Sequence, residues 1–137
     1  MVERHREALL GFIESQVDLL FANEAEATSL MQVASFDEAV AGLRERVTLA
    51  AVTRSEAGSV ILAGGERLTV AAESVEKVVD TTGAGDQYAA GFMFGLARGR
   101  PLQLCGKLGS IAAAEVISHY GPRPQVPLKD LAAARGY

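Results

Sequence analysis

The chain has 137 residues, of which 49% are hydrophobic, and a formal net charge of −4 at pH 7. This length suits one domain with a substantial core and leaves too little sequence for two. Because no cluster of lysine or arginine is present to replace the counterions of a phosphate backbone, the composition argues against a nucleic-acid partner.

Cysteine and histidine are too sparse for a disulfide or a metal centre. Cys105 has no second cysteine to pair with, and the apolar helical pattern around it predicts a buried core residue rather than a reactive thiol. His5 and His119 are far apart and lack metal-ligand spacing. The N-terminal stretch is amphipathic, without an apolar run long enough for a signal peptide or a span, so we expect a cytoplasmic protein with no membrane partner.

The first third of the chain predicts a helix, a strand and two further helices. Apolar residues at helical spacing indicate a helix over 4–13, and the apolar run at 17–22 has the length of a buried strand. Asn23 followed by Glu26 has the capping-box pattern of a helix start, and Ser35 with Glu38 repeats it.

The remaining elements complete an alternation of strands and helices. Residues 47–53 are apolar at successive positions, which predicts a strand covered on both faces. The runs "SVILAG" and "RLTVAA" around Gly64 and Gly65 predict a hairpin toward the sheet edge. A further strand ending at Val79 follows, then a helix that begins near Ala84 and stops near Gly99, and another that starts at Pro101 and continues through Val116. This order predicts a layered α/β fold with a mainly parallel sheet.

Gly91, Gly95 and Gly99 recur at a spacing that places them near one helix face. The backbone of another segment could pack closely against this face. Alternatively, the glycines are small residues that the helix tolerates without any packing role. The tail from Gly121 is rich in proline and is expected to follow the surface before a last helical turn.

The stretch "DTTGAGDQY" at 80–88 is a candidate phosphate site of an unusual kind. A dinucleotide-binding loop needs Gly or Ala where Tyr88 stands, and a P-loop needs a lysine that is absent after these glycines. What remains is a loop of small residues before a helix, whose converging N–H groups and helix dipole can hold an anion without Lys or Arg.

Asp86 would lie in the first turn of that helix, beside the anion. If the anion is a transferring phosphoryl group, the transition state is loose, so an ionised carboxylate that orients the attacking hydroxyl is sufficient. The alternative is that Asp86 is merely a favourable first-turn acid and that the glycines only form a tight turn. Spacing alone does not separate the two interpretations.

The longer stretch "DTTGAGDQYAAGFM" closely resembles the C-terminal signature of the ribokinase-like (PfkB) carbohydrate and nucleoside kinases. The resemblance implies a ribokinase-like three-layer α/β/α fold. It also implies that Asp86 is the catalytic base and that the amides of Gly83, Ala84, Gly85 and Asp86 form the anion hole for the γ-phosphate of ATP.

Three other segments resemble the same family in the same order. "FANEAEA" implies that Asn23 and Glu26 organise Mg²⁺ through water, although a plain capping box explains the same residues. "VTRSEAGSVI" implies that Thr53 and Gly58 border ATP, with Ser55 in place of a usual glycine.

The third segment, "AAAEVISHYGPRP", resembles the end of bacterial adenosine kinases and related sugar kinases. It implies that His119 and Gly121 lie beside the adenine. Together with Asp80 and Thr82, Gly121 is also a candidate for K⁺ binding.

The resemblance covers the later half of the family's usual sequence, so residues 1–137 are expected to form the C-terminal nucleotide-binding part of a kinase domain. The half that supplies the early strands, the lid and most substrate contacts has no counterpart here. Two hypotheses follow. The chain is an ATP-dependent phosphotransferase acting on an alcohol group of a sugar or nucleoside, or it is a truncated nucleotide-binding fragment without activity of its own. A fragment with an open sheet edge would form a homodimer or associate with the missing half.

Overall fold

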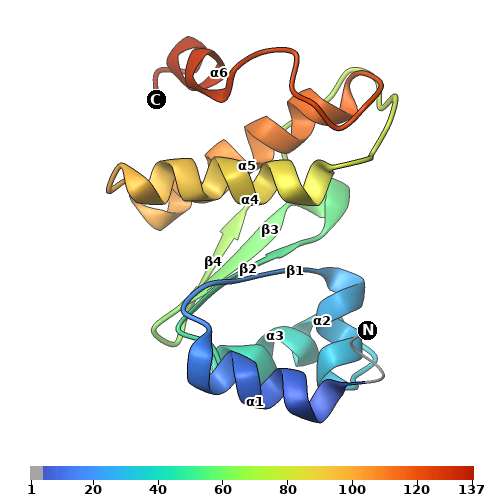
Figure 1. Cartoon of the computed structure of the whole chain (residues 1–137), viewed down its shortest axis with the longest axis vertical. Helices are drawn as coiled ribbons and strands as arrows, with labels where there is room; N and C mark the ends of the chain where they lie inside the picture. The colour runs from blue at the N-terminus through green and yellow to red at the C-terminus, as the bar shows by residue number, and fades with distance from the viewer. Residues whose placement is uncertain (1–4) are drawn as a thin grey trace. The chain divides into compact units, whose positions relative to one another are not determined.

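The computed structural model describes residues 5–137, which form two compact units (Figure 1). The sheet unit takes the described residues up to Arg54 together with Ser59–Thr69, and the helical unit takes Ser55–Gly58 together with Val70–Tyr137. The expectation of a single nucleotide-binding part stays a prediction.

Helices α1 (Arg6–Gln16), α2 (Glu24–Met31) and α3 (Phe36–Arg44) belong to the sheet unit. The helix expected over 4–13 is therefore confirmed from Arg6 onward, while Arg4 lies outside the described residues. Both expected helices after the first strand are also present. All three pack one apolar face into a common core, which contains Leu10, Ile13, Ala27, Leu30, Phe36, Ala39, Val40, Leu43, Ala50, Val52, Val60 and Leu62.

The described sheet has the strand order β1 (Leu20–Asn23), β2 (Leu49–Thr53), β3 (Ser59–Ala63), β4 (Glu66–Val70). Strands β1 and β2 are parallel and β2 and β3 are antiparallel, so the sheet is mixed. Successive residues Ala50, Ala51 and Val52 are all fully buried, which confirms a strand covered on both faces. The α/β class is confirmed.

The hairpin between β3 and β4 is confirmed, with β4 at the end of the strand order. Gly64 and Gly65 have φ values of +55° and +84°. A two-residue turn that matches the twist of the strands needs positive φ at both positions, and glycine adopts it without steric cost.

The helical unit consists mainly of α4 (Ala84–Ala97), α5 (Leu102–Ile117) and the short α6 (Leu128–Ala134), with a 3₁₀ turn at Ser55–Ala57. Helices α4 and α5 lie side by side (Figure 1). A Cβ at Gly91 would lie 2.4 Å from the Leu108 carbonyl oxygen, and one at Gly95 would lie 3.1 Å from Cys105 Sγ. Close backbone packing is therefore confirmed for these two glycines.

Gly99 differs from the other two glycines of the series. It follows the end of α4 with φ +67°, and a Cβ there would meet no atom within 4 Å. The prediction that Gly99 shares the packing face is wrong, because the residue serves the turn between α4 and α5.

The strand predicted to end at Val79 is also wrong, because residues 71–83 contain no strand. The amide of Val79 donates to the carbonyl of Ile117 at 2.8 Å, and that of Asp80 donates to the same oxygen at 3.3 Å. These amides therefore satisfy the carbonyl end of α5 instead of pairing with a neighbouring strand.

Cys105 is fully buried, as predicted, and its thiol lies 3.6 Å from the carbonyl oxygen of Arg100. Burial raises the pKa of this thiol, which disfavours the reactive thiolate. No helix in the described part of the chain is long and apolar enough to span a membrane.

Candidate functional site

The glycine turn, residues 80–86, leads into α4. Gly83 is the residue before the helix and has φ +80°; a Cβ there would also come within 2.7 Å of Pro122 Cβ. Gly85 lies within the first turn, and a Cβ there would meet nothing within 4 Å. The positive φ and the nearby Pro122 thus require glycine at position 83. At position 85 the structure has room for a side chain.

Asp80 ties the glycine turn to the loop after α5. Its Oδ1 accepts hydrogen bonds from the amide of Thr82 at 3.0 Å and from Thr82 Oγ1 at 2.7 Å, and its Oδ2 accepts from the amide of Gly121 at 3.1 Å. The hydrogen bonds from Thr82, and then that from Gly121, lower the pKa of Asp80. The three residues predicted for K⁺ are thus brought together.

The backbone amides at the start of α4 differ in their bonding. The amide of Ala84 donates to the carbonyl of Thr81 at 3.2 Å, so it is used within the turn. The amides of Gly83, Gly85 and Asp86 have no protein acceptor among residues 5–137. Three of the four amides predicted for the anion hole are therefore available to a ligand.

Asp86 occupies the third position of α4 and is exposed. Its carboxylate forms no ion pair within the described chain. A free carboxylate beside three unused amides can orient a hydroxyl toward an anion held by those amides.

His119 is held by the protein through both ring nitrogens. Nδ1 lies 3.1 Å from the carbonyl oxygen of Tyr120, and Nε2 lies 2.9 Å from Oε1 of Glu115, which also accepts from the amide of Gln125 at 3.0 Å. Contact between His119 and a nucleotide would therefore use the ring face. The hydrogen bond to Tyr120, followed by the interactions with Glu115, raises the pKa of His119.

This shift predicts a pH dependence of stability. Because the folded pKa is above the unfolded value of about 6.5, the stabilisation from protonated His119 is complete below that pH and is lost as pH rises through the folded pKa. The melting temperature of the wild-type chain should therefore fall relative to that of His119→Gln as the pH rises above about 6.5. If the melting temperatures of the two proteins change in parallel as the pH rises, protonated His119 does not stabilise the folded chain.

Glu115 is a residue that the sequence pattern did not single out. Its side chain is 9% exposed, and its Oε2 is buried with no hydrogen-bond partner. It lines a cavity of about 280 Å³ between segment 73–76, α5 and α6. The i, i+4 spacing of Glu115 and His119 on a predicted helix is the signal that could have revealed the pair.

In the sheet unit, Asn23 and Glu26 form the capping box that the sequence predicts. Asn23 Oδ1 accepts from the amide of Glu26 at 2.8 Å, and Glu26 Oε1 accepts from the amide of Asn23 at 3.1 Å. The structure therefore gives both residues a role in starting α2. Among the described residues no group of three or more His, Cys, Asp or Glu side chains could hold a metal ion.

Thr53 is the register partner of Asn23 in the parallel pair β1–β2, so the two residues lie side by side at the carboxyl ends of these strands. Next to them Arg54 contacts Glu24 at 3.5 Å, and its guanidinium lies 4.0 Å from the centre of the Phe36 ring. The carboxyl end of a parallel pair is where ligands approach α/β sheets.

Gly58 and Ser55 belong to the helical unit. Gly58 has φ +89°, and a Cβ there would lie 2.1 Å from the carbonyl oxygen of Val70, so the backbone requires glycine. Ser55 replaces a usual glycine and has φ +52°, a conformation that glycine adopts more readily. The predicted site residues are thus divided between the units, with Asn23, Glu26 and Thr53 in the first and the others in the second.

Comparison with known proteins identifies the family. The model of the pfkB family carbohydrate kinases matches residues 3–129, and the chain belongs to this family. A cytidine kinase from Thermococcus kodakarensis is 37% identical over 118 residues, which are 85% of this chain and 42% of the relative.

Solved structures give the same result. The crystal structure of adenosine kinase from Sinorhizobium meliloti is 51% identical, with a TM-score of 0.91 over 98% of this chain and 41% of that one. Arabidopsis thaliana ribokinase, solved with ribose and ATP, is 25% identical, with a TM-score of 0.81 over 93% of this chain and 43% of that one. The fold is ribokinase-like, and the chain spans about two fifths of the length of these proteins.

Proposed function

We propose that this chain is the nucleotide-binding part of an ATP-dependent phosphotransferase that acts on an alcohol group of a sugar or nucleoside. Membership of the pfkB family supports the reaction class. The observation that carries the proposal is the start of α4, where the amides of Gly83, Gly85 and Asp86 lack a protein acceptor among the described residues, beside the exposed Asp86 carboxylate. Cytoplasmic location is part of the same proposal.

In this proposal the amides and the dipole of α4 hold the γ-phosphate. Asp86 orients the substrate hydroxyl toward the phosphorus and accepts its proton late, as the new O–P bond forms and the bond to the ADP oxygen breaks. Thr53, Gly58, His119 and Gly121 are proposed as further ATP contacts. The ribokinase with bound ribose and ATP is 25% identical and supports this class of nucleotide and substrate.

The metal proposals fit the residues to different degrees. Glu26 and Asn23 each use one side-chain oxygen in the capping box, but a carboxylate has about four acceptor positions, so Glu26 retains capacity for a water of Mg²⁺. The ion would supply charge neutralisation at the phosphates. Asp80 is committed to Thr82 and Gly121, a task that needs no cation, so K⁺ at these residues stays a prediction.

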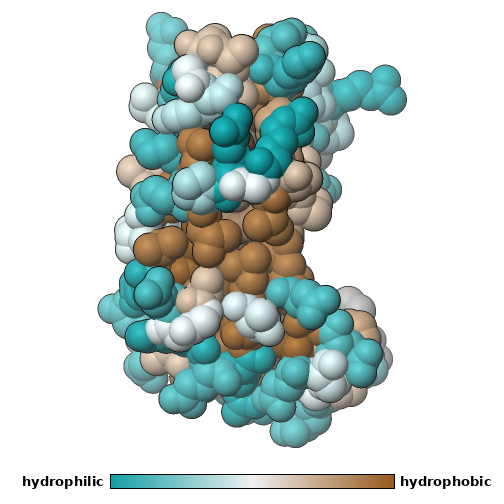
Figure 2. Space-filling view, turned by 90° about the vertical axis from the view of Figure 1, so that its left-hand side faces the viewer, coloured by the Kyte–Doolittle hydropathy of each residue, from teal (hydrophilic) through white to brown (hydrophobic). Residues whose placement is uncertain are grey.

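The second candidate function is a nucleotide-binding fragment that needs another chain for activity. The chain spans about two fifths of the length of the relatives. Apolar residues also reach the surface, as the brown area of Figure 2 shows; the large exposed ones are Phe12, Val78, Met93, Leu96, Tyr120, Val126 and Tyr137. Such surface is typical of proteins that associate, as a homodimer or with a complementary half.

ATP binding is tested by thermal shift with ATP and Mg²⁺, because a ligand that binds the folded state raises the melting temperature. We expect a saturable rise in the wild-type chain. Gly85→Asp, which has open space for its side chain, should abolish the rise by placing a like charge before the anion hole. Gly11→Asp is the matched control, since a Cβ there also meets no atom within 4 Å.

No rise in the wild-type chain, or an equal rise in Gly85→Asp, would refute nucleotide binding at the glycine turn. The two candidate functions are then separated by ADP release in the presence of a panel of sugars and nucleosides. Substrate-dependent release by the chain alone favours the enzyme, whereas binding without release favours the fragment.

A further inference from the structure

The turn between α4 and α5 has a fixed geometry that presents two arginines. The amide of Gly99 donates to the carbonyl of Leu96 and that of Arg100 to the carbonyl of Gly95, each at 3.0 Å, while Gly99 takes φ +67°. This is the hydrogen-bond pattern of a Schellman motif, which orders the backbone at the end of a helix. Arg98 and Arg100 on either side of Gly99 therefore start from a rigid backbone.

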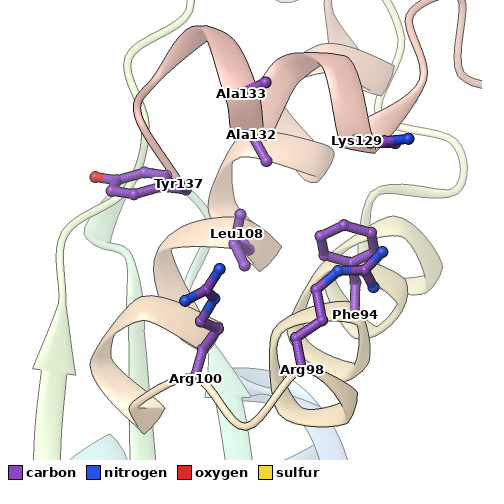
Figure 3. A pocket seen from close by; sticks show the side chains of 8 residues that line it. All are labelled: Phe94, Arg98, Arg100, Leu108, Lys129, Ala132, Ala133 and Tyr137. Carbon is purple, nitrogen blue, oxygen red and sulfur yellow. The ribbon is translucent and has the colours of Figure 1, made fainter.

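These arginines line a cavity of about 210 Å³ in the helical unit, here called the basic pocket. Figure 3 shows Arg98 and Arg100 rising from the turn, with Lys129 on α6. Leu108 of α5 and Ala132 of α6 are buried residues that give the pocket an apolar wall. The basic pocket thus combines three cations with an apolar surface.

The side chains that line the basic pocket carry positive charge and no negative charge. None of its lining residues is acidic, and neither Arg98, Arg100 nor Lys129 forms an ion pair within residues 5–137. Five of the seven other arginines in this part of the chain pair with carboxylates, namely Arg6, Arg46, Arg54, Arg67 and Arg135, whereas Arg44 and Arg123 do not. Three unpaired cations gathered in a chain of net charge −4 indicate an anionic occupant.

We propose that the basic pocket binds a small organic phosphate monoester, at a place separate from the glycine turn. Its volume is below the roughly 300–1,000 Å³ of drug-sized sites, which favours a phosphate ester of one ring over a nucleoside triphosphate. Guanidinium groups form forked hydrogen bonds with phosphate oxygens, and a dianion balances the local charge better than a monoanion does.

The pocket walls suit the two parts of such a ligand. The Arg98 guanidinium lies 3.7 Å from the centre of the Phe94 ring, a cation–π contact that limits its movement and leaves its edge for the phosphate. Arg100 and Lys129 complete the anion contacts. The ring of the ester lies against Leu108 and Ala132, where it removes apolar surface from water.

The test is a titration of the ¹⁵N-labelled full chain with phenyl phosphate at low ionic strength, followed through backbone amide shifts. We expect saturable shifts at Gly99, Arg100 and Lys129. The double variant Arg98→Gln/Arg100→Gln should weaken binding at least about tenfold, because both forked contacts are lost. The control Lys77→Gln/Lys107→Gln, which removes the same charge from exposed residues outside the pocket lining, should bind as the wild-type does.

Two comparison ligands test the two halves of the proposal. Inorganic phosphate should bind several-fold more weakly than phenyl phosphate because it lacks the ring, and benzoate should bind more weakly because it carries one charge. Equal binding of either ligand would overturn the assignment to an organic phosphate. The site itself would be overturned by shifts confined to residues 83–86, or by unchanged affinity in the arginine double variant.

Discussion

Replacing Asp86 by asparagine is expected to lower the rate of phosphoryl transfer about a thousandfold, while ATP affinity changes by less than about threefold. Asparagine keeps the size and polarity of the side chain but cannot accept the hydroxyl proton. The carboxylate is exposed and forms no ion pair within residues 5–137, and it accepts no hydrogen bond from the nearby amides, so the proposed anion hole should remain intact. The rate is measured on the chain, extended at its N-terminus to the length of its relatives if the chain alone does not turn over.

A matched control is available on another helix. Asp130 occupies the third position of α6, as Asp86 does in α4, and it is also exposed. If Asp86 is only a favourable first-turn acid, Asp86→Asn and Asp130→Asn should each cost about 0.3–1 kcal/mol of stability and leave the transfer rate unchanged. Comparable rates in the two variants would remove Asp86 from the proposed mechanism.

The largest effect on stability is expected from Gly91→Ala. A Cβ at Gly91 would lie 2.4 Å from the carbonyl oxygen of Leu108 and 2.8 Å from Cα of Gly109, and both are backbone atoms that cannot turn aside. Helices α4 and α5 would have to separate along their contact. The free energy of unfolding should fall by about 3 kcal/mol, the upper part of the usual range for overpacking.

The same helix supplies the control for Gly91→Ala. A methyl group at Gly85 would meet no atom within 4 Å, so Gly85→Ala should raise stability slightly, by about 0.5 kcal/mol, through helix propensity alone. Both variants are compared with the wild-type chain by urea unfolding followed by circular dichroism. Similar midpoints for Gly91→Ala and the wild-type chain would show that α4 and α5 are not packed as closely as described.

Features that depend on neighbouring residues could be predicted from the sequence. Gly64 and Gly65 mark the hairpin because few other residues take positive φ in succession, and Asn23 with Glu26 marks a helix start because the two side chains satisfy each other's amides. The spacing of Gly91 and Gly95 likewise predicted close helix packing, because residues four apart lie on one helix face.

Features that depend on distant residues could not be predicted in this way. The apolar residues before Asp80 are suitable for a strand, but nothing local shows that the amide of Val79 bonds to Ile117 instead. The hydrogen bond between Asp80 and Gly121 joins residues 41 positions apart. For the candidate site, the pattern located the glycine turn, but only the folded structure shows that the amide of Ala84 is already used by Thr81.

The burial of Cys105 has a practical consequence for spectroscopy. Its thiol is enclosed and its pKa is raised, so the native chain should be nearly silent toward thiol-directed reagents at neutral pH. A cysteine introduced at an exposed position, such as Ser118 in the loop joined to the glycine turn, would then carry a fluorophore or spin label at one defined place. The natural sequence thus provides a background for single-site labelling without removing its own cysteine.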